Sequence, residues 1–322
     1  LMYTLVHFAM QFGVLGGTPW SKLKKVKFIC PAPGYDRHFA VTQQFGIEMI
    51  TVRMNEDGPD MDVIETLVRE DDSIKGIWCV PKYSNPTGIT FSDSVVERMA
   101  TMKTAASNFR IFWDNAYIVH SLYDTDDQLK NIFDVARKAG TIDRIYSFAS
   151  TSKITFAGSG VSAIAASEAN IKVILRLMFY KSICPNKINQ VMHVNFLGNL
   201  AGIKRVMAQH AELLRPKFEL FDKKFTEAFE GDEFVKWSKP RGGYFISVDV
   251  RKCAKRTVEL AAKAGVKFTE AGATFPYKLD DMDSNIRIAP SVPTLEEMDF
   301  AVDVLSSAIR QARIERVLVK AK

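Results

Sequence analysis

The chain has few cysteines and few histidines. Its 322 residues include five histidines and four cysteines, and Cys30, Cys79, Cys184 and Cys253 form no C-x-x-C pair. This spacing argues against a zinc site and against the framework of a small disulfide-rich protein. The four thiols are instead typical of reduced, mostly buried side chains in a cytoplasmic protein.

Low-complexity tracts and long uncharged apolar runs are also missing. The most apolar segment, residues 1–17, contains Tyr3, His7 and Gln11 and has no cationic start. It therefore predicts a core helix rather than a membrane anchor or an export signal, and we expect no membrane partner. Because the first residue is Leu1 rather than methionine, we expect the chain to begin inside a longer protein.

Charge of one sign is not in large excess. The chain has 43 lysines and arginines against 37 aspartates and glutamates, for a net charge of +6, and the basic residues form no arms. The charge therefore gives no reason to expect a nucleic-acid partner. Apolar residues make up 47% and charged residues 25% of the chain, a balance typical of globular proteins and not of disordered ones.

The order of apolar runs predicts an α/β fold. Between residues 26 and 164, short apolar runs alternate with amphipathic stretches, which indicates a mostly parallel sheet flanked by helices. The expected strands are 26–30, 48–52, 74–80, 110–114 and 144–148. The expected helices between them are 38–45, 60–70, 93–105 and 128–139.

The rest of the chain has a different pattern. Long helical stretches come first, at 170–180, 187–197 and 202–230. Pro216 lies inside the last of these, and we expect it to bend the helix. Shorter elements follow, with strands expected at 234–237, 244–250 and 285–289 and helices at 253–264 and 295–312. We therefore divide the chain into a large domain, residues 1–200, and a small C-terminal α+β domain, residues 201–322, which includes the connecting helix.

Polar and aromatic side chains gather in segments at the ends of expected strands, where open α/β sheets bind ligands. Four of these segments are P-A-P-G-Y-D-R-H after Cys30, P-K-Y-S-N-P-T-G after Val80, D-N-A-Y from Asp114 and S-T-S-K from Ser150. A fifth, N-I-R-I-A-P, lies late in the chain. The candidate site residues in these segments are Tyr35, His38, Asn85, Asp114, Tyr117, Ser150, Lys153 and Arg287.

Each of these residues also has a purely structural explanation. Asn and Gly in N-P-T-G suit a turn, and Asp114 could cap the turn after its strand. Lys153 alone is typical of a solvated lysine, Arg287 could point outward from a half-buried strand, and Tyr35 and His38 could be packed loop residues. The combination is harder to explain in this way. A carboxylate for a ring nitrogen and an amine for an aldehyde are what a pyridoxal phosphate site needs.

The motifs resemble those of a known enzyme family. N-P-T-G, D-N-A-Y, S-T-S-K, G-G-Y-F and N-I-R-I-A-P occur in the order found in the fold-type I pyridoxal-phosphate aminotransferases. The strings P-A-P-G-Y-D-R-H-F, V-P-K-Y-S-N-P-T-G, F-A-S-T-S-K-I-T-F-A-G and A-G-A-T-F-P-Y resemble a bacterial subgroup of aspartate aminotransferases. The resemblance covers nearly the whole chain. It implies a cofactor-binding large domain and the transfer of an amino group from an L-amino acid, aspartate or glutamate, to a 2-oxo acid by a ping-pong mechanism.

The resemblance implies roles for the reacting groups. Lys153 matches the lysine that bonds the aldehyde of pyridoxal phosphate and then moves the substrate proton. Asp114 matches the carboxylate that faces the pyridine nitrogen, and His38 matches the histidine that holds this carboxylate.

The remaining roles concern the ring, the phosphate and the substrate. Tyr117 and Asn85 match the donors to the phenolic oxygen of the ring, Tyr35 the aromatic side chain on the ring face, and Ser150 a donor to the phosphate. Arg287 matches the guanidinium that binds the substrate α-carboxylate through two parallel hydrogen bonds, assisted by Asn85.

The chain departs from the family pattern in three places. Val161 stands where many relatives have a second phosphate-binding arginine, with Ser159 or Ser162 as alternative donors, and Met192 stands where the subgroup pattern N-Q-L-R-H has arginine. The phosphate-binding turn of the family would precede Leu1, so we expect weaker cofactor binding or lower activity in this stretch of chain. Since family members are usually homodimers, we also expect a cytoplasmic homodimer.

Two other functions stay open. A pyridoxal-phosphate lyase or decarboxylase could use the same scaffold, although Arg287 favours retention of the substrate carboxylate. An aminotransferase-like regulatory or ligand-sensing domain is the other alternative, although no basic recognition helix is evident. The cation for the side-chain carboxylate of the substrate is also open, with Arg241 and Lys187 among the candidates.

Overall fold

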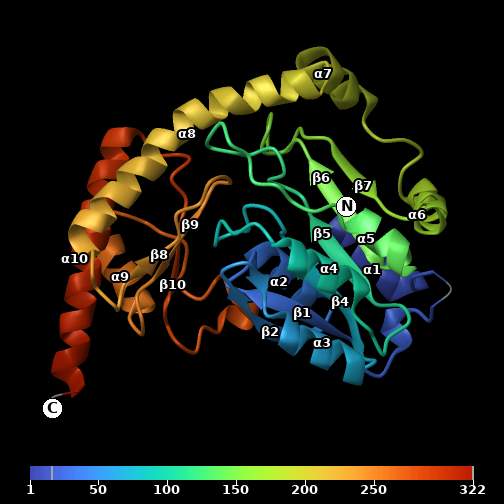
Figure 1. Ribbon diagram of the computed structural model, residues 1–322, viewed down its shortest axis with the longest axis horizontal. Coiled ribbons are helices and arrows are strands. Elements are labelled where there is room, and N and C mark those ends of the chain that lie inside the picture. Colours follow the sequence, from blue (N-terminus) through green and yellow to red (C-terminus); the bar gives the residue numbers. More distant parts are fainter. Residues whose placement is uncertain (16, 321–322) are drawn as a thin grey trace.

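Two β-sheets connected by a long helix make up the protein (Figure 1). The structure is a computed structural model that describes residues 1–15 and 17–320. The first sheet has seven strands in the order β3-β2-β1-β4-β5-β6-β7, and the second has three in the order β10-β9-β8. The predicted α/β class, with a mostly parallel sheet flanked by helices, is confirmed.

The first sheet is parallel except at its edges. Its strands are β1 (Lys27–Ala32), β2 (Glu48–Asn55), β3 (Gly58–Pro59), β4 (Ile74–Cys79), β5 (Arg110–Asp114), β6 (Ile145–Ser150) and β7 (Ser162–Ala165). β3 and β7 pair antiparallel with β2 and β6, and the other pairs are parallel. The five predicted strands are the five parallel ones. β3 and β7 were not predicted, because β3 has two residues and β7 is a short edge strand with mostly exposed side chains.

Helices cover both faces of the first sheet. They are α1 (Met2–Phe12), α2 (Asp36–Gln44), α3 (Met61–Glu70), α4 (Asp93–Thr101), α5 (Ile132–Ala139) and α6 (Glu168–Lys181). One hydrophobic core joins the sheet to α3, α4 and α5, and a second core joins it to α1, α2 and α6. Side chains cap four of these helices, since Asp60, Ser92, Asn131 and Ser167 each accept a hydrogen bond from a backbone N–H of the first turn.

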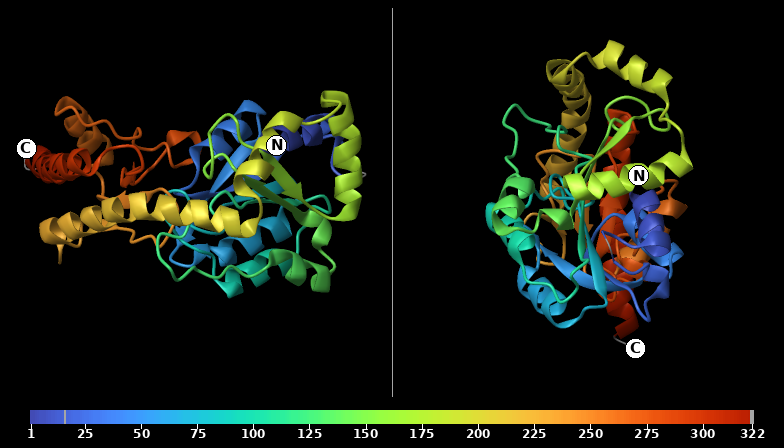
Figure 2. Two further views of the ribbon diagram at one scale, coloured as in Figure 1. Left: turned by 90° about the horizontal axis from the view of Figure 1, so that it is seen from above. Right: turned by 90° about the vertical axis from the view of Figure 1, so that its right-hand side faces the viewer.

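The second sheet has its own core. Its antiparallel strands are β8 (Lys236–Trp237), β9 (Ile246–Asp249) and β10 (Asn285–Ile288). Helices α8 (Leu200–Phe229), α9 (Ala254–Lys263) and α10 (Leu295–Lys320) pack against it around Phe221, Phe225, Val248 and Leu305. Helix α7 (Lys187–Leu197) precedes α8, which stays helical through Pro216 and reaches from the first sheet to the second (Figure 2).

Segments at the carboxyl ends of the parallel strands contact loops that flank the strands of the second sheet. The Gly34 N–H donates to the Thr274 carbonyl at 2.8 Å, and the Leu122 N–H donates to the Arg241 carbonyl at 2.9 Å. A cleft of about 1270 Å³ also lies between the two parts, but Lys153 and Asp114 are not among its lining residues. Short 3₁₀ turns complete the fold at Trp20–Lys22, Ile142–Arg144 and Pro276–Lys278.

The cysteines and the described helices agree with an ordinary globular core. All four cysteines are unpaired, and three are buried while Cys184 is exposed. Among residues 1–15 and 17–320, no helix combines the length and the apolar character that a membrane span requires.

Candidate active site

Four neighbouring strands bring the predicted site residues to one edge of the first sheet. Strands β1, β4, β5 and β6 are adjacent and parallel, so their carboxyl ends lie side by side. His38 follows β1 on α2, Asn85 follows β4, and Asp114 is the last residue of β5. Tyr117 and Lys153 follow β5 and β6. The sheet order alone therefore places these five side chains in one region.

Asp114 and His38 form a buried pair. The His38 Nε2 lies 3.1 Å from the Asp114 Oδ2, and the two side chains are 4% and 7% exposed. Because a carboxylate oxygen accepts hydrogen bonds, Nε2 is the ring nitrogen that carries the hydrogen. The imidazole also stacks on Trp78, with ring centroids 4.4 Å apart and an interplanar angle of 11°. These contacts fix the orientation of the carboxylate.

The Lys153 amine lies beside Tyr117 and is affected by the charge of Asp114. Its Nζ is 5.1 Å from the centroid of the Tyr117 ring. Burial lowers the pKa of the Lys153 ammonium, and the negative charge of Asp114 partly opposes this change. A lowered pKa increases the fraction of neutral amine, which is the form that acts as a nucleophile or a base.

Tyr117 and Asn85 supply hydrogen-bond donors beside the lysine. Tyr117 is buried, and burial together with the charge of Asp114 raises the pKa of its phenol well above the ordinary value. The hydroxyl therefore keeps its proton. Asn85 is 1% exposed, and its amide Nδ2 has no hydrogen-bond partner among the described residues. A buried donor without a partner is costly unless a ligand satisfies it.

Arg287 reaches the same region from the second sheet. It lies on β10, and its Nη1 donates to the Asp36 Oδ1 at 2.8 Å and to the Asn85 Oδ1 at 3.3 Å. The guanidinium lies over the Phe245 ring, 5.2 Å from its centroid. Its buried Nε has no hydrogen-bond partner among the described residues. The side chain is 10% exposed and points toward the first sheet, so it does not point outward from its strand.

The two remaining predicted residues lie at the margins. The Tyr35 ring meets the His38 ring edge-on at 5.0 Å, and burial and the charges of Asp36 and Asp114 raise the pKa of its phenol. Ser150 ends β6, and its hydroxyl accepts a hydrogen bond from the Ser152 N–H at 3.4 Å. In the part of the chain that the structure describes, this contact connects Ser150 with the lysine loop and not with the other candidate residues.

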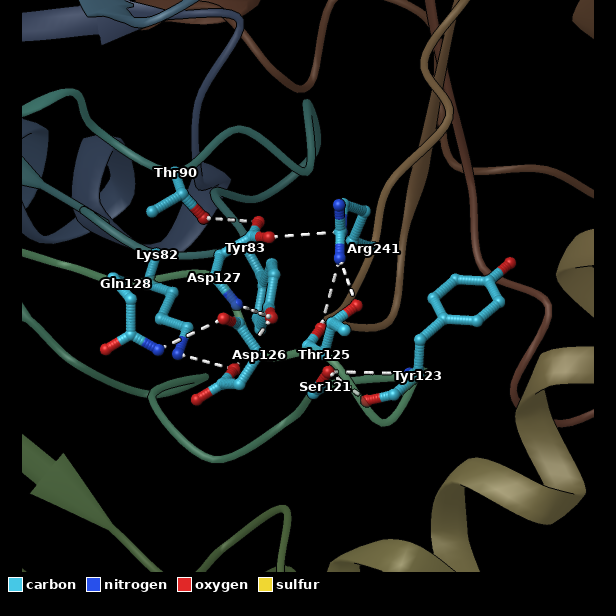
Figure 3. Close-up of polar contacts among 10 residues, drawn as sticks. All are labelled: Lys82, Tyr83, Thr90, Ser121, Tyr123, Thr125, Asp126, Asp127, Gln128 and Arg241. Carbon is cyan, nitrogen blue, oxygen red and sulfur yellow. Dashed lines mark hydrogen bonds and ion pairs between the residues drawn. The ribbon is translucent and has the colours of Figure 1, made fainter.

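A polar network supports the loop that carries Asn85 (Figure 3). The buried Lys82 donates to the Asp126 Oδ1 at 2.7 Å, and the Tyr83 hydroxyl donates to the same oxygen at 3.0 Å. Arg241, a candidate cation for the substrate, is 3.1 Å from the Asp127 Oδ1 through its Nε. These contacts hold the Asn85 loop against residues 121–128 and give Arg241 a carboxylate partner within the protein.

Three further residues that contact the lysine loop were not identified from the sequence. His120 and Tyr244 contact the main-chain carbonyl of Lys153, and His193 contacts the hydroxyl of Thr151. Tyr244 belongs to G-G-Y-F, so the motif pointed to the segment without giving this residue a role. A contact with a main-chain atom leaves no pattern in the sequence, and an isolated histidine such as His120 is equally compatible with a core position. His193 ends the N-Q-V-M-H string, which the motif comparison considered only for Met192.

Comparison with known proteins identifies the protein as an aminotransferase. The fold is that of the fold-type I pyridoxal-phosphate aminotransferases, as the motifs predicted. The family model described as aspartate amino-transferase matches residues 1–321, and the chain belongs to this family. Enzymes of this class transfer an amino group between an amino acid and a 2-oxo acid.

Relatives agree with this family over almost the whole chain. A protein of Mycolicibacterium smegmatis named as an aminotransferase is 49% identical over 99% of this chain and 75% of its own length. The aspartate aminotransferase of Corynebacterium glutamicum is 43% identical over 98% of this chain and 73% of its own length. A crystal structure of an aspartate transaminase from the same organism has a TM-score of 0.95 at 43% identity and covers 98% of this chain and 74% of that chain.

Proposed function

We propose that the protein transfers the amino group of aspartate or glutamate to a 2-oxo acid with pyridoxal phosphate as its cofactor, by a ping-pong mechanism. The observation that carries the proposal is the placement of Lys153 at the sheet edge where Asp114 ends β5, with its Nζ 5.1 Å from the centroid of the Tyr117 ring. Burial also lowers the pKa of this amine. The preference for a dicarboxylic amino acid is supported by similarity to the aspartate aminotransferase of C. glutamicum.

The residues around Lys153 fit this cofactor. The unpartnered Nδ2 of Asn85 and the protonated hydroxyl of Tyr117 are donors suited to the phenolic oxygen of the ring. Asp114, held by His38, provides a carboxylate for the ring nitrogen. When bound, pyridoxal phosphate accepts the electron pair that an amino acid retains when its Cα loses a proton. Tyr35 would contact the ring face and Ser150 would donate to the phosphate.

Lys153 is the proposed proton carrier. In this role its Nζ takes the proton from the Cα of the substrate, which requires a neutral amine. Burial favours the neutral amine by lowering the pKa, and the half-buried position also restricts access of water. The negative charge of Asp114 acts in the opposite direction on this pKa. Once Nζ has taken the proton, the resulting ammonium is the acid that returns it.

Arg287 is the proposed ligand of the substrate α-carboxylate. Its planar guanidinium can donate two parallel hydrogen bonds to a carboxylate, and its Nε is free of partners among the described residues. The Asn85 Oδ1, 3.3 Å from Nη1, orients the guanidinium from one side, and the Phe245 ring supports its face. A substrate bound here would keep its carboxylate, which favours transamination over decarboxylation.

We further propose a homodimer and a two-domain organisation. Large apolar side chains on and between α6 and α7 are exposed, among them Phe179 at 62%, Tyr180 at 81% and Ile183 at 90%. Exposed large apolar side chains gathered in one part of the chain are typical of a protein interface. The separate hydrophobic core around the second sheet supports a boundary near residue 200 between the large domain, 1–200, and the small domain, 201–322.

Replacement of Lys153 tests the proposed function. In Lys153→Ala, the production of oxaloacetate from aspartate with 2-oxoglutarate as acceptor should fall by at least about a thousandfold, because both the nucleophile and the proton carrier are lost. Lys172→Ala is the matched control, since Lys172 is exposed and pairs with Glu168 on α6. Activity of Lys153→Ala close to that of the control would overturn the proposal.

Product analysis of the unmodified protein tests the reaction type. With 2-oxoglutarate as acceptor, aspartate should yield oxaloacetate and an equal amount of glutamate, because Arg287 retains the α-carboxylate and the amino group passes to the acceptor. Stoichiometric carbon dioxide in place of an oxo acid would identify a decarboxylase instead.

A further inference from the structure

The main-chain carbonyl of Lys153 is contacted by two side chains from outside its own loop. The Tyr244 hydroxyl lies 2.9 Å from this oxygen, and the His120 Nε2 lies 3.4 Å from it. Because a carbonyl oxygen only accepts, both groups donate. The hydrogen on His120 is therefore on Nε2, and its buried Nδ1 has no partner among the described residues.

The two donors come from different parts of the fold. His120 follows β5 of the first sheet, whereas Tyr244 precedes β9 of the second. They are held together, since the Gly243 N–H donates to the His120 carbonyl at 2.9 Å and the two side-chain rings are 5.3 Å apart. The Lys153 carbonyl thus lies where the two sheets meet.

The Tyr117 ring completes this arrangement. Its centroid is 5.5 Å from that of His120 and 6.1 Å from that of Tyr244, with steeply inclined ring planes in both pairs. The Lys153 Nζ lies over the same Tyr117 ring. The carbonyl and the amine of Lys153 are therefore both placed against one aromatic cluster, which consists of Tyr117, His120 and Tyr244.

We propose that Tyr244 is a positioning residue for Lys153, with His120 as the second donor to the same carbonyl. The proposal rests on the proposed function, in which Lys153 is the reacting amine. The carbonyl carbon is bonded to the Cα from which the long lysine side chain extends. A rotation of about 10° at this Cα moves Nζ by about 1 Å, a displacement that can cost about a hundredfold in rate.

Both donors keep the charge state that this role needs. Burial raises the pKa of Tyr244 to about 12, so its hydroxyl stays protonated. Burial also lowers the pKa of His120 to about 4. The hydrogen bond to the Lys153 carbonyl opposes this change, and the charges of Lys153 and His210 add to it. The carbonyl is therefore held by neutral donors, and no further cation is placed beside the amine at neutral pH.

The adjacent residue contacts the other proposed binding group. Phe245 lies under the Arg287 guanidinium, while Tyr244 donates to the lysine carbonyl. Tyr244 and Phe245 are successive residues of G-G-Y-F, and they contact Lys153 and Arg287 respectively. A shift of this segment would therefore disturb both proposed binding groups.

Tyr244→Phe removes the hydroxyl and keeps the ring, so it tests the proposal with little change in packing. Tyr277→Phe is the matched control, because the Tyr277 hydroxyl also binds a main-chain group, the Met49 N–H at 2.9 Å, away from Lys153. The first readout needs no cofactor. Acylation of Lys153 by acetic anhydride is followed against pH in the cofactor-free protein, and the lysine peptide is quantified by mass spectrometry.

The proposal predicts a shift in this profile. With a looser main chain, the Lys153 amine becomes more hydrated, so the midpoint of its acylation moves to higher pH in Tyr244→Phe and stays unchanged in Tyr277→Phe. In the loaded enzyme, kcat falls by about tenfold in Tyr244→Phe, with KM for the amino acid changed by less than about twofold. Identical acylation profiles and equal kcat values in the two variants would overturn the proposal.

Two further measurements separate the possible failures. His120→Phe removes the second donor to the same carbonyl and keeps an aromatic ring. It should shift the acylation midpoint in the same direction, including if Tyr244→Phe does not fold. An unshifted midpoint in a folded His120→Phe variant would count against the proposal. Failure of the proposed function is distinguished by Lys153→Ala. Activity in this variant would show that Lys153 is not the reacting amine, and it would leave the acylation midpoints measured in Tyr244→Phe and Tyr277→Phe unchanged.

Discussion

Burial sets the protonation states of single residues around Lys153. Removal from water disfavours the charged form of each group, so the pKa values of Lys153 and His120 are lowered and that of Tyr117 is raised. Near neutral pH the imidazole of His120 and the phenol of Tyr117 are therefore uncharged. The amine of Lys153 has a larger neutral fraction than an exposed lysine. These are the states in which the two rings can act as donors and the amine can accept a proton.

His120 should make the protein less stable in acid. Its pKa is about 4 in the folded protein and 6.5 in the unfolded chain, so the unfolded state binds more protons between these values. The free energy of unfolding is therefore unaffected by His120 above about pH 6.5. It decreases as the pH falls toward 4, by about 3 kcal/mol in all. Urea unfolding of the protein and of His120→Gln between pH 4.5 and 7.5 measures it. The same dependence on pH in both proteins would contradict this assignment.

Sequence motifs predicted which residues are candidates for the site, but they did not predict the contacts that these residues make. Lys153, Asp114 and Asn85 stand in short strings at strand ends, where position in an α/β sheet already suggests a ligand site. The contacts of Tyr244 and His120 with the Lys153 carbonyl could not be predicted in this way, because they depend on how the second sheet docks. The pairing of Arg241 with Asp127 was equally hidden.

At the scale of elements, the turn before β9 needs glycine for lack of space. A Cβ on Gly242 would lie 2.3 Å from the Tyr83 ring and 2.5 Å from the His120 carbonyl oxygen. The two contacts come from the Asn85 loop and from the segment that carries His120. The turn therefore joins three segments that support the candidate site.

Gly242→Ala should lower the free energy of unfolding by about 1–3 kcal/mol through overpacking, and it should also reduce activity. Gly140→Ala is the comparison, because Gly140 has a φ of +73° but no atom within 4 Å of an added Cβ. It should affect stability through backbone strain alone and leave activity unchanged. Denaturant unfolding and the transamination assay measure both effects. An active Gly242→Ala protein of normal stability would show that the turn has more room than the structure gives it.

The interiors of the elements were more predictable than their ends. β4 and β5 are buried along their whole length and have the apolar runs expected of central parallel strands. Helix α5 begins at Ile132 rather than at residue 128, because the Asn131 side chain accepts from the Phe133 N–H and sets the start. Helix α4 ends at Thr101, four residues before the predicted end. Such ends depend on individual hydrogen bonds that apolar periodicity does not reveal.

At the scale of the whole molecule, the α6–α7 face should determine the oligomeric state. Phe179→Glu combined with Ile183→Glu places two charges on this face and should weaken dimerisation by about a hundredfold or more, because a buried unpaired charge is costly. Val292→Glu is the control, since Val292 is 91% exposed outside α6 and α7. Sedimentation equilibrium over a range of concentrations measures the change. A dimer of equal strength in both variants would place the interface elsewhere.

The arrangement of the two sheets was the least predictable feature. Asn85 and Arg287 are 202 residues apart in sequence, yet the Arg287 Nη1 lies 3.3 Å from the Asn85 Oδ1. Local patterns predicted a change of character near residue 200, which stays a prediction as a domain boundary. They could not predict the docking of the second sheet, because this depends on contacts between distant loops.

The claim on which the account depends is that the Nζ of Lys153 bonds the aldehyde of pyridoxal phosphate. Incubation with the cofactor, reduction with borohydride and mapping of the labelled peptides tests it directly. The account predicts one pyridoxyl label, on the peptide that contains Lys153, and its absence in Lys153→Ala. A stoichiometric label on another lysine, or the same label in Lys153→Ala, would contradict it.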